Sequence, residues 1–235
     1  MEKKYKLIFV IPVYNESEII EKVVDDIINE LNDIDFKVLL INDGSSDNTL
    51  EKIIKIKDKY NQIIDYIDQE NIGHGPTLFK GYSYALKNNF DYIFQIDSDN
   101  QFEISDFRKL WDIREKYNLV IGFRKNRKDT FIRIILTRIV RLLIQFLFFV
   151  RIKDSNCPFR LINKDLLIEC IKLFKSDTLI PNIFISIVAA KKKTLFFKEI
   201  SHLDRKTGKV SIVNIKLIFF CLKSLVQTLN FRLKI

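Results

Sequence analysis

Two aspartates and a glutamine stand at alternate positions in the stretch YIFQIDSDNQF, residues 92–102. Asp97 and Asp99 directly follow a run of apolar and aromatic residues, and Gln101 keeps the same spacing. Carboxylate oxygens at alternate positions can point toward one cation, and Mg²⁺ and Mn²⁺ prefer such oxygen ligands. A solvated turn is the alternative, because Asp and Asn are also ordinary turn residues. The stretch predicts a divalent metal site if neighbouring segments support it.

Two further polar clusters follow apolar runs earlier in the chain. PVYNE, residues 12–16, ends the run at 6–13, and NDGSSDNT, residues 42–49, ends the run at 36–42. Both runs are almost continuously apolar, as expected of strands that are buried on both faces. Any one cluster could be a simple loop, but three clusters after three strands favour a binding site.

Helical patterns alternate with strand patterns through the first half of the chain. The expected strands are residues 6–13, 36–42, 62–68 and 90–97, and the expected helices are 17–31, 47–60, 76–88 and 103–117. This alternation predicts a parallel sheet with helices on both faces. Ligands of such sheets bind beyond the carboxyl ends of the strands, which is where the three polar clusters come.

The net charge of +9 is divided unevenly along the chain. Through Phe123 there are 15 Lys and Arg residues and 23 Asp and Glu, whereas from Arg124 onward the counts are 24 and 7. A basic second half predicts an anionic partner. Because its basic residues are threaded through aliphatic and Phe-rich stretches, an anionic membrane surface fits better than nucleic acid. We expect no nucleic-acid partner.

Two long apolar stretches, residues 131–150 and 212–235, carry spaced basic residues. Arg133, Arg138 and Arg141 interrupt the first, and neither stretch has the roughly 20 uninterrupted apolar residues that a spanning helix needs. The spacing favours amphipathic helices in a membrane interface, with buried core helices as the alternative. The three cysteines have no pairing or metal-ligand spacing, which fits a reducing compartment. We predict a peripheral protein on the cytoplasmic face of a membrane.

The chain resembles the family 2 glycosyltransferases in the order and spacing of four segments: PVYNE (12–16), DGSSDNT (43–49), NIGHGPTLFKGYSYA (71–85) and DSDNQF (97–102). That resemblance implies an α/β protein with the GT-A fold. This fold is a Rossmann-like, mostly parallel sheet flanked by helices, and here C-terminal amphipathic helices would follow. Residues 1–123 would form the part that binds a nucleotide-diphosphate sugar. Residues 124–235 would form the acceptor-binding and membrane-interface part of the same domain.

The resemblance also implies roles for single residues. The donor nucleotide would be bound by Pro12, Tyr14, Glu16, Asp43, Asp97 and Ser98. Within this set, Asp43 would read the base. The divalent cation, Mg²⁺ or Mn²⁺, would be held by Asp97, Asp99 and Gln101. A cation there would stabilise the charge that develops on the diphosphate as its bond to the sugar breaks.

Segments of the second half resemble one branch of that family, the dolichol-phosphate mannose synthase-like polyprenyl-phosphate glycosyltransferases. They are IGFR (121–124), RIILT (133–137), DSNCPFRLINKDLL (154–167) and HLDRKTGKVS (202–211). By this resemblance the acceptor phosphate would be bound by Arg124, Arg133, Thr137 and Arg205, and the catalytic set would be Asp97, Asp99, Arg124 and Arg133. Arginine suits phosphate because its planar fork can donate two parallel hydrogen bonds.

The absence of one motif indicates the chemical class of the acceptor. Relatives that glycosylate a hydroxyl usually carry a Glu-Asp pair whose Asp is the general base, and no such pair follows Asp99 here. A hydroxyl needs a base to remove its proton, whereas a phosphate monoester is already ionised. We therefore expect inverting, metal-dependent transfer from a UDP- or GDP-sugar to polyprenyl phosphate, with Asp154 as a fallback base. The alternatives are transfer to a saccharide hydroxyl in glycan assembly and a noncatalytic, peripheral membrane-binding module.

Overall fold

The computed structural model describes residues 5–124, 131–201, 203 and 214–235, with side chains for all of these except 131–137 and 214–218. The strands are β1 (Leu7–Val13), β2 (Phe36–Asp43), β3 (Ile64–Gln69), β4 (Tyr92–Gln95), β5 (Leu119–Arg124), β6 (Arg160–Asn163) and β7 (Leu195–Ile200). The helices are α1 (Ile20–Glu30), α2 (Thr49–Lys59), α3 (His74–Lys87), α4 (Phe107–Trp111), α5 (Phe131–Phe148), α6 (Lys164–Leu173), α7 (Pro181–Lys191) and α8 (Asn214–Arg232), with a 3₁₀ turn η1 (Ile104–Asp106) before α4.

The strands form one seven-stranded sheet in the order β3-β2-β1-β4-β6-β5-β7. β3, β2, β1 and β4 are parallel neighbours, and β5 and β7 are also parallel to each other. β6 lies between β4 and β5 and is antiparallel to both. The predicted α/β fold with a mostly parallel sheet is therefore confirmed, and both halves of the chain contribute strands to it.

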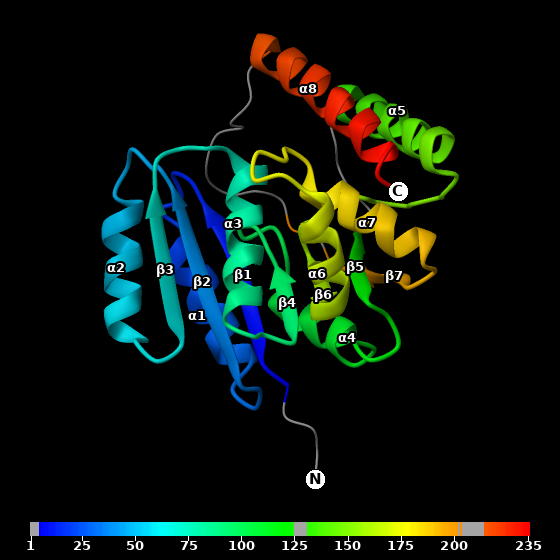
Figure 1. Cartoon of the computed structure of the whole chain (residues 1–235). Coiled ribbons are helices and arrows are strands. Elements are labelled where there is room, and N and C mark those ends of the chain that lie inside the picture. Colours follow the sequence, from blue (N-terminus) through cyan, green and yellow to red (C-terminus); the bar gives the residue numbers. More distant parts are fainter. Residues whose placement is uncertain (1–4, 125–130, 202, 204–213) are drawn as a thin grey trace.

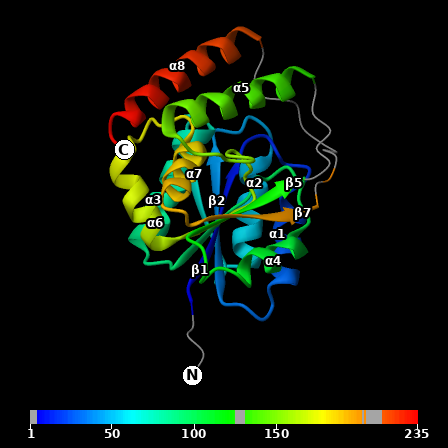
Figure 2. The same ribbon diagram turned by 90° about the vertical axis from the view of Figure 1, so that its right-hand side faces the viewer.

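Helices cover both faces of the sheet (Figure 2). α1, α2 and α4 lie on one face, and α3, α6 and α7 lie on the other. α5 and α8 pack side by side beyond the end of the sheet toward which β1 and β2 run (Figure 1). This arrangement leaves the carboxyl ends of the central strands on the side of the molecule that carries the α5–α8 pair.

The central strand β1 is buried in the core and packs closely against α3. All seven residues of β1 are buried, as its continuous apolar run predicts. α3 lies directly on this strand, because a Cβ at Gly81 would come within 2.4 Å of Val10 Cγ1 and 2.8 Å of Ile41 Cδ1. The close approach fixes the beginning of α3 near the carboxyl ends of β1 and β2.

The helix expected over residues 103–117 is much shorter in the structure. It consists of η1 and α4, and turns follow from residue 112. In these turns Ile113 N, Arg114 N and Lys116 N each donate to the carbonyl three residues earlier, so the α-helical bonding pattern is lost. The segment 112–116, DIREK, has one apolar residue and cannot provide a helical apolar face.

The two basic, apolar stretches are helical, as predicted, and form α5 and α8. In the part of the chain that the structure describes, no helix is long and apolar enough to cross a membrane. The second half of the chain also contributes β5, β6, β7, α6 and α7, for which no bounds were predicted.

Candidate functional site

The polar clusters after β1 and β2 are hydrogen-bonded to each other. Asn15 N donates to Ser45 Oγ at 3.0 Å, and Ser46 N donates to Asn15 Oδ1 at 2.7 Å. Asn15 has a φ of 55°, a left-handed conformation that asparagine tolerates better than most residues. The backbone N–H of Glu16 donates to Thr49 Oγ1 at 2.9 Å. Residues 12–16 and 42–49, which are far apart in sequence, are therefore hydrogen-bonded into one polar surface at the edge of the sheet. We call this surface the platform.

The third cluster, after β4, joins the same platform. Ser98 Oγ, which is buried, donates to the carbonyl of Pro12 at 3.1 Å. Asp97 is partly exposed, with 32% of its side chain accessible, and Asp99 is half-buried. Gln101 N donates to Asp99 Oδ1 at 3.3 Å, which curls the chain after the strand. The polar residues after β1, β2 and β4 therefore lie together, as predicted.

Asp43 holds a loop at this platform. Its buried carboxylate accepts hydrogen bonds from Gln69 Nε2 and Ile72 N at 2.9 Å, and from Gly73 N at 3.0 Å. The loop leads into α3 and brings His74 Nε2 to 4.0 Å from Asp97 Oδ1. Both oxygens of Asp43 therefore have intramolecular donors. Reading of a base by Asp43 stays a prediction.

The remaining residues predicted for the donor lie at the same edge. Tyr14 is 40% exposed beyond the end of β1, so this residue is accessible to a ligand. Glu16 is buried. Pro12 lies in β1 opposite Ile41 of β2. The donor set named from the sequence is thus spatially contiguous, while its role stays a prediction.

Of the four residues predicted to bind the acceptor phosphate, Arg124 is the one whose side chain the structure describes. Arg124, at the end of β5, forms an ion pair with Asp154 at 2.7 Å, and the two side chains are 9% and 12% exposed. Asn156 N also donates to Asp154 Oδ1, at 3.2 Å. Arg133 and Thr137 lie in α5, where their side chains are not described, and Arg205 lies outside the described residues.

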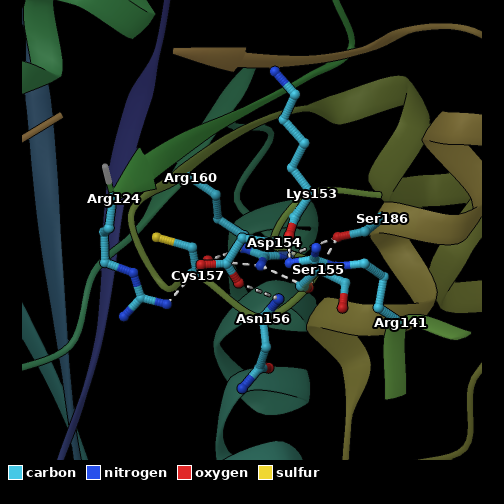
Figure 3. A network of polar contacts seen from close by, with 9 residues as sticks. All are labelled: Arg124, Arg141, Lys153, Asp154, Ser155, Asn156, Cys157, Arg160 and Ser186. Atoms are coloured by element: carbon cyan, nitrogen blue, oxygen red, sulfur yellow. Dashed lines mark hydrogen bonds and ion pairs between the residues drawn. The ribbon is translucent and has the colours of Figure 1, made fainter. Parts of the chain in front are cut away.

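A buried polar cluster that was not predicted from the sequence surrounds Arg160 (Figure 3). This arginine is fully buried in β6 and donates to backbone carbonyls of residues 155, 157 and 182. Burial lowers the pKa of Arg160. A signal was present, because a charged residue inside the apolar run CPFRLI indicates a buried charge with specific partners.

Two further pKa shifts bear on the chemistry of the site. Burial raises the pKa of the Cys157 thiol to about 11, so this cysteine stays protonated at neutral pH and is a poor nucleophile. Burial would also raise the pKa of Asp47, but hydrogen bonds from Thr49 and Ser17 outweigh it and hold that pKa below its usual range. Asp47 therefore stays ionised and fixes the loop after β2.

Asp97, Asp99 and Gln101 have the chemistry that a hard divalent cation requires. Two carboxylates and an amide oxygen follow one strand, and their side chains are partly open at the platform. Among the described residues, no group of three or more His, Cys, Asp and Glu side chains could hold a metal ion. A cation at this position would need further oxygen ligands, such as water and substrate phosphates, as Mg²⁺ sites commonly do.

Comparison with solved structures identifies the fold. Glucosyl-3-phosphoglycerate synthase from Mycobacterium tuberculosis, in complex with Mn²⁺, uridine diphosphate and phosphoglyceric acid, is similar with a TM-score of 0.68 at 15% identity. The similarity covers 97% of this chain and 78% of that one. The fold is the GT-A fold of glycosyltransferases. The chain belongs to glycosyl transferase family 2, because the model of that family matches residues 8–171.

Two relatives are similar in sequence. A dolichyl-phosphate beta-glucosyltransferase of Trichomonas vaginalis is 28% identical over 189 residues, which cover 72% of this chain and 56% of the relative. An undecaprenyl-phosphate 4-deoxy-4-formamido-L-arabinose transferase of Proteus mirabilis is 26% identical over 223 residues, covering 92% and 66%. The matches therefore span less than two thirds of the length of these relatives.

Proposed function

We propose that this protein is an inverting, metal-dependent glycosyltransferase that moves a sugar from a UDP- or GDP-sugar to a polyprenyl-phosphate acceptor. One observation carries the proposal. The polar ends of β1, β2 and β4 are hydrogen-bonded into a single platform, and Asp97 and Asp99 are partly open on it. A donor bound there would lie beyond the carboxyl ends of parallel strands, where α/β sheets bind ligands.

The donor would be held in two parts. Exposed Tyr14 would offer its ring to the base or ribose, and Pro12, Glu16, Asp43 and Ser98 would form the rest of the nucleotide site. Asp97, Asp99 and Gln101 would hold Mg²⁺ or Mn²⁺ at the diphosphate. The cation, when bound, would neutralise charge that develops on the leaving diphosphate.

The acceptor would be a lipid phosphate. One phosphate oxygen would attack the anomeric carbon from the side opposite the diphosphate, and the bond to the nucleoside diphosphate would break as the new bond forms. Such an oxygen has no proton to lose, so no general base is required. Asp154 is engaged by Arg124 in a mostly buried ion pair, which supports a positioning role for it. Both relatives are named for a polyprenyl phosphate, which is dolichyl phosphate in one and undecaprenyl phosphate in the other.

Residues 124–235 would also provide a membrane-facing surface. Exposed apolar side chains recur every three or four residues along α5 and α8 and at the residue directly after each helix. We call this set the outer apolar face: Ile139, Leu142, Phe146, Phe149, Phe219, Leu222, Val226, Leu229 and Leu233. Exposed Arg138 and Lys223 lie on the same two helices. Apolar side chains flanked by cations suit an anionic membrane, and we propose peripheral association with its cytoplasmic face.

The first experiment tests the donor site and the acceptor together. Asp99→Ala should remove metal-dependent donor turnover while the protein stays folded, and Asp112→Ala, which changes an exposed acid directly after α4, is the matched control. Transfer is measured to a polyprenyl phosphate and to a saccharide, with Mn²⁺ present. Unchanged turnover in Asp99→Ala would remove the site assignment. Transfer to the saccharide alone would establish the hydroxyl-acceptor alternative instead.

The second experiment tests the membrane surface. The double change Phe146→Ser and Leu222→Ser removes two exposed apolar side chains, each contributing about 1.5–3 kcal/mol when buried in lipid, so binding to anionic vesicles should fall at least about a hundredfold. Ile54→Ser, which removes an exposed apolar side chain of α2, is the control. Co-sedimentation at low and high salt is the assay. If the wild-type protein binds the vesicles at neither low nor high salt, membrane association is contradicted.

A further inference from the structure

Three arginines from three elements converge on residues 153–157, which we call the 153–157 segment (Figure 3). Arg141 of α5 donates from Nη2 to the carbonyl of Lys153 at 2.8 Å. Arg124 of β5 donates to Asp154 Oδ2 at 2.7 Å. Arg160 of β6 donates to the carbonyl of residue 155 at 3.1 Å and twice to that of residue 157, at 2.8 and 2.6 Å. The segment is therefore held by donors of three separate elements.

Arg160 differs from the other two because it is fully buried. The groups that accept its hydrogen bonds are all neutral, and they include two on α7: the carbonyl of Asn182 at 2.8 Å and Ser186 Oγ at 3.4 Å. Burying a cation is costly unless its hydrogen bonds are satisfied, and a guanidinium has five N–H donors in a fixed fork. The fork of Arg160 thus joins the 153–157 segment to the start of α7 in one geometry.

The position of Arg160 in the sheet connects the two halves of the site. It lies opposite Gln95 of β4 on one side and Ile121 of β5 on the other. β4 leads directly to Asp97, and β5 ends at Arg124. The antiparallel strand β6 is inserted between β4, which leads to the predicted metal ligands, and β5, which ends at a residue predicted to bind the acceptor.

A buried polar chain continues from Arg160 toward Asp97. The hydroxyl of Tyr82 donates to Asn182 Oδ1 at 2.9 Å and lies 3.1 Å from Gln95 Oε1. Gln95 Nε2 lies 3.5 Å from Asp97 Oδ1. Desolvation raises the pKa of Tyr82, so its hydroxyl stays protonated as a donor. The carboxylate at the platform and the 153–157 segment are thereby linked through packed polar groups.

We propose that Arg160 is a positioning residue that sets the Arg124–Asp154 pair at the distance from Asp97 that sugar transfer requires. The proposal rests on the proposed function. Arg160 has the shape for this task because a planar fork can hold several carbonyls at once, whereas a lysine offers a single ammonium group. The consequence is specific: loosening this fork should impair the use of the acceptor more than the binding of the donor.

The test compares two serines that make the same local bond. Ser186 Oγ donates to the carbonyl four residues earlier at 2.7 Å and also contacts Arg160 and the carbonyl of residue 155. Ser83 Oγ donates to the carbonyl four residues earlier at 2.8 Å in α3. Ser186→Ala and Arg160→Lys should raise the acceptor KM or lower kcat about tenfold, since misplacement of about 1 Å can cost more than that. Ser83→Ala should leave both constants unchanged.

Two measurements distinguish a positioning role from a general loss of structure: the affinity for the donor, and the energetic coupling between Arg160 and Asp154 in a double variant. The Kd for the nucleoside diphosphate with Mn²⁺ should change less than about twofold in Ser186→Ala and Arg160→Lys. Arg160→Lys combined with Asp154→Asn should be non-additive in kcat/KM for the acceptor, because both changes act through one pair. Additive effects, or equal losses of donor and acceptor affinity, would overturn the proposal.

Amide hydrogen exchange of the 153–157 segment, measured without substrate, keeps the two proposals separable. Exchange there should become faster in Ser186→Ala and Arg160→Lys but not in Ser83→Ala. If the wild type transfers sugar to no lipid phosphate, the proposed function fails, and unchanged exchange in these variants would independently overturn the role of Arg160. If Arg160→Lys does not fold, Ser186→Ala alone decides.

Discussion

Replacement of Asp154 by asparagine separates the two roles that this residue could have. Its carboxylate pairs with Arg124 at 2.7 Å, and both side chains are about nine-tenths buried, with exposures of 12% and 9%. Removing one partner of a buried pair costs roughly 3–5 kcal/mol. Asparagine keeps an oxygen that can accept from Arg124, so we expect a loss of about 3 kcal/mol in the free energy of unfolding, the lower end of that range.

Urea unfolding measures this loss. With an m-value of about 2–3 kcal/mol per M for a chain of this size, the midpoint should fall by about 1 M. Asp33→Asn is the control, because the ion pair of Asp33 with Arg108 is exposed and such pairs contribute roughly 0–1 kcal/mol. Equal small shifts in both variants would refute the view that the Arg124–Asp154 pair is buried and structural.

The same variant tests the acceptor chemistry. A general base is worth about 10²- to 10⁴-fold in rate. If the acceptor is a phosphate, Asp154→Asn should raise the KM for the acceptor and lower kcat by less than about tenfold. A drop in kcat of about a hundredfold or more at saturating acceptor, with KM unchanged, would refute the reasoning. That result would make Asp154 the base for a hydroxyl acceptor.

Three further changes test how the platform is held. Asp43→Asn places an amide N–H₂ against the N–H of Gly73 and should cost about 1.5–3 kcal/mol in urea unfolding, with an unchanged midpoint as the contrary result. Gly75→Ala puts a Cβ 2.3 Å from the carbonyl oxygen of Leu179 and should cost about 1–3 kcal/mol or more, lowering Tm; wild-type Tm would contradict that clash. Because the pKa of Asp47 is lowered on folding, its contribution to stability is present above about pH 4 and is lost as the pH falls through the folded pKa. Asp47→Asn should therefore reduce the acid dependence of the unfolding free energy below about pH 4, and an identical pH profile would count against it.

The donor side of the site could be predicted from the sequence because its signals are local. Continuous apolar runs identify the buried strands β1 and β2, and polar residues directly after them must lie where the strands end. Parallel strands bring those ends to one edge, so contiguity of residues 12–16, 42–49 and 97–101 follows without knowledge of their contacts. Helical periodicity in α5 and α8 likewise depends on neighbours three and four residues apart.

The partners of the acidic groups depend on pairings between distant residues, which no local pattern specifies. Asp43 meets the N–H groups of residues 72 and 73, and Asp154 meets Arg124 thirty residues away. Both contacts require the loops to be brought together by the sheet. Sequence therefore predicted which side chains reach the edge but not which of them already have intramolecular partners.

By itself, the sequence determined the strand and helix alternation of the first half, the polar edge of the sheet and the helical character of the basic, apolar stretches. The tertiary structure alone decided that β6 enters antiparallel between β4 and β5 and buries Arg160 among carbonyls. The physical reason is that strand order and the satisfaction of a buried cation arise from long-range packing. Periodicity and turn residues describe only the conformation of neighbours along the chain.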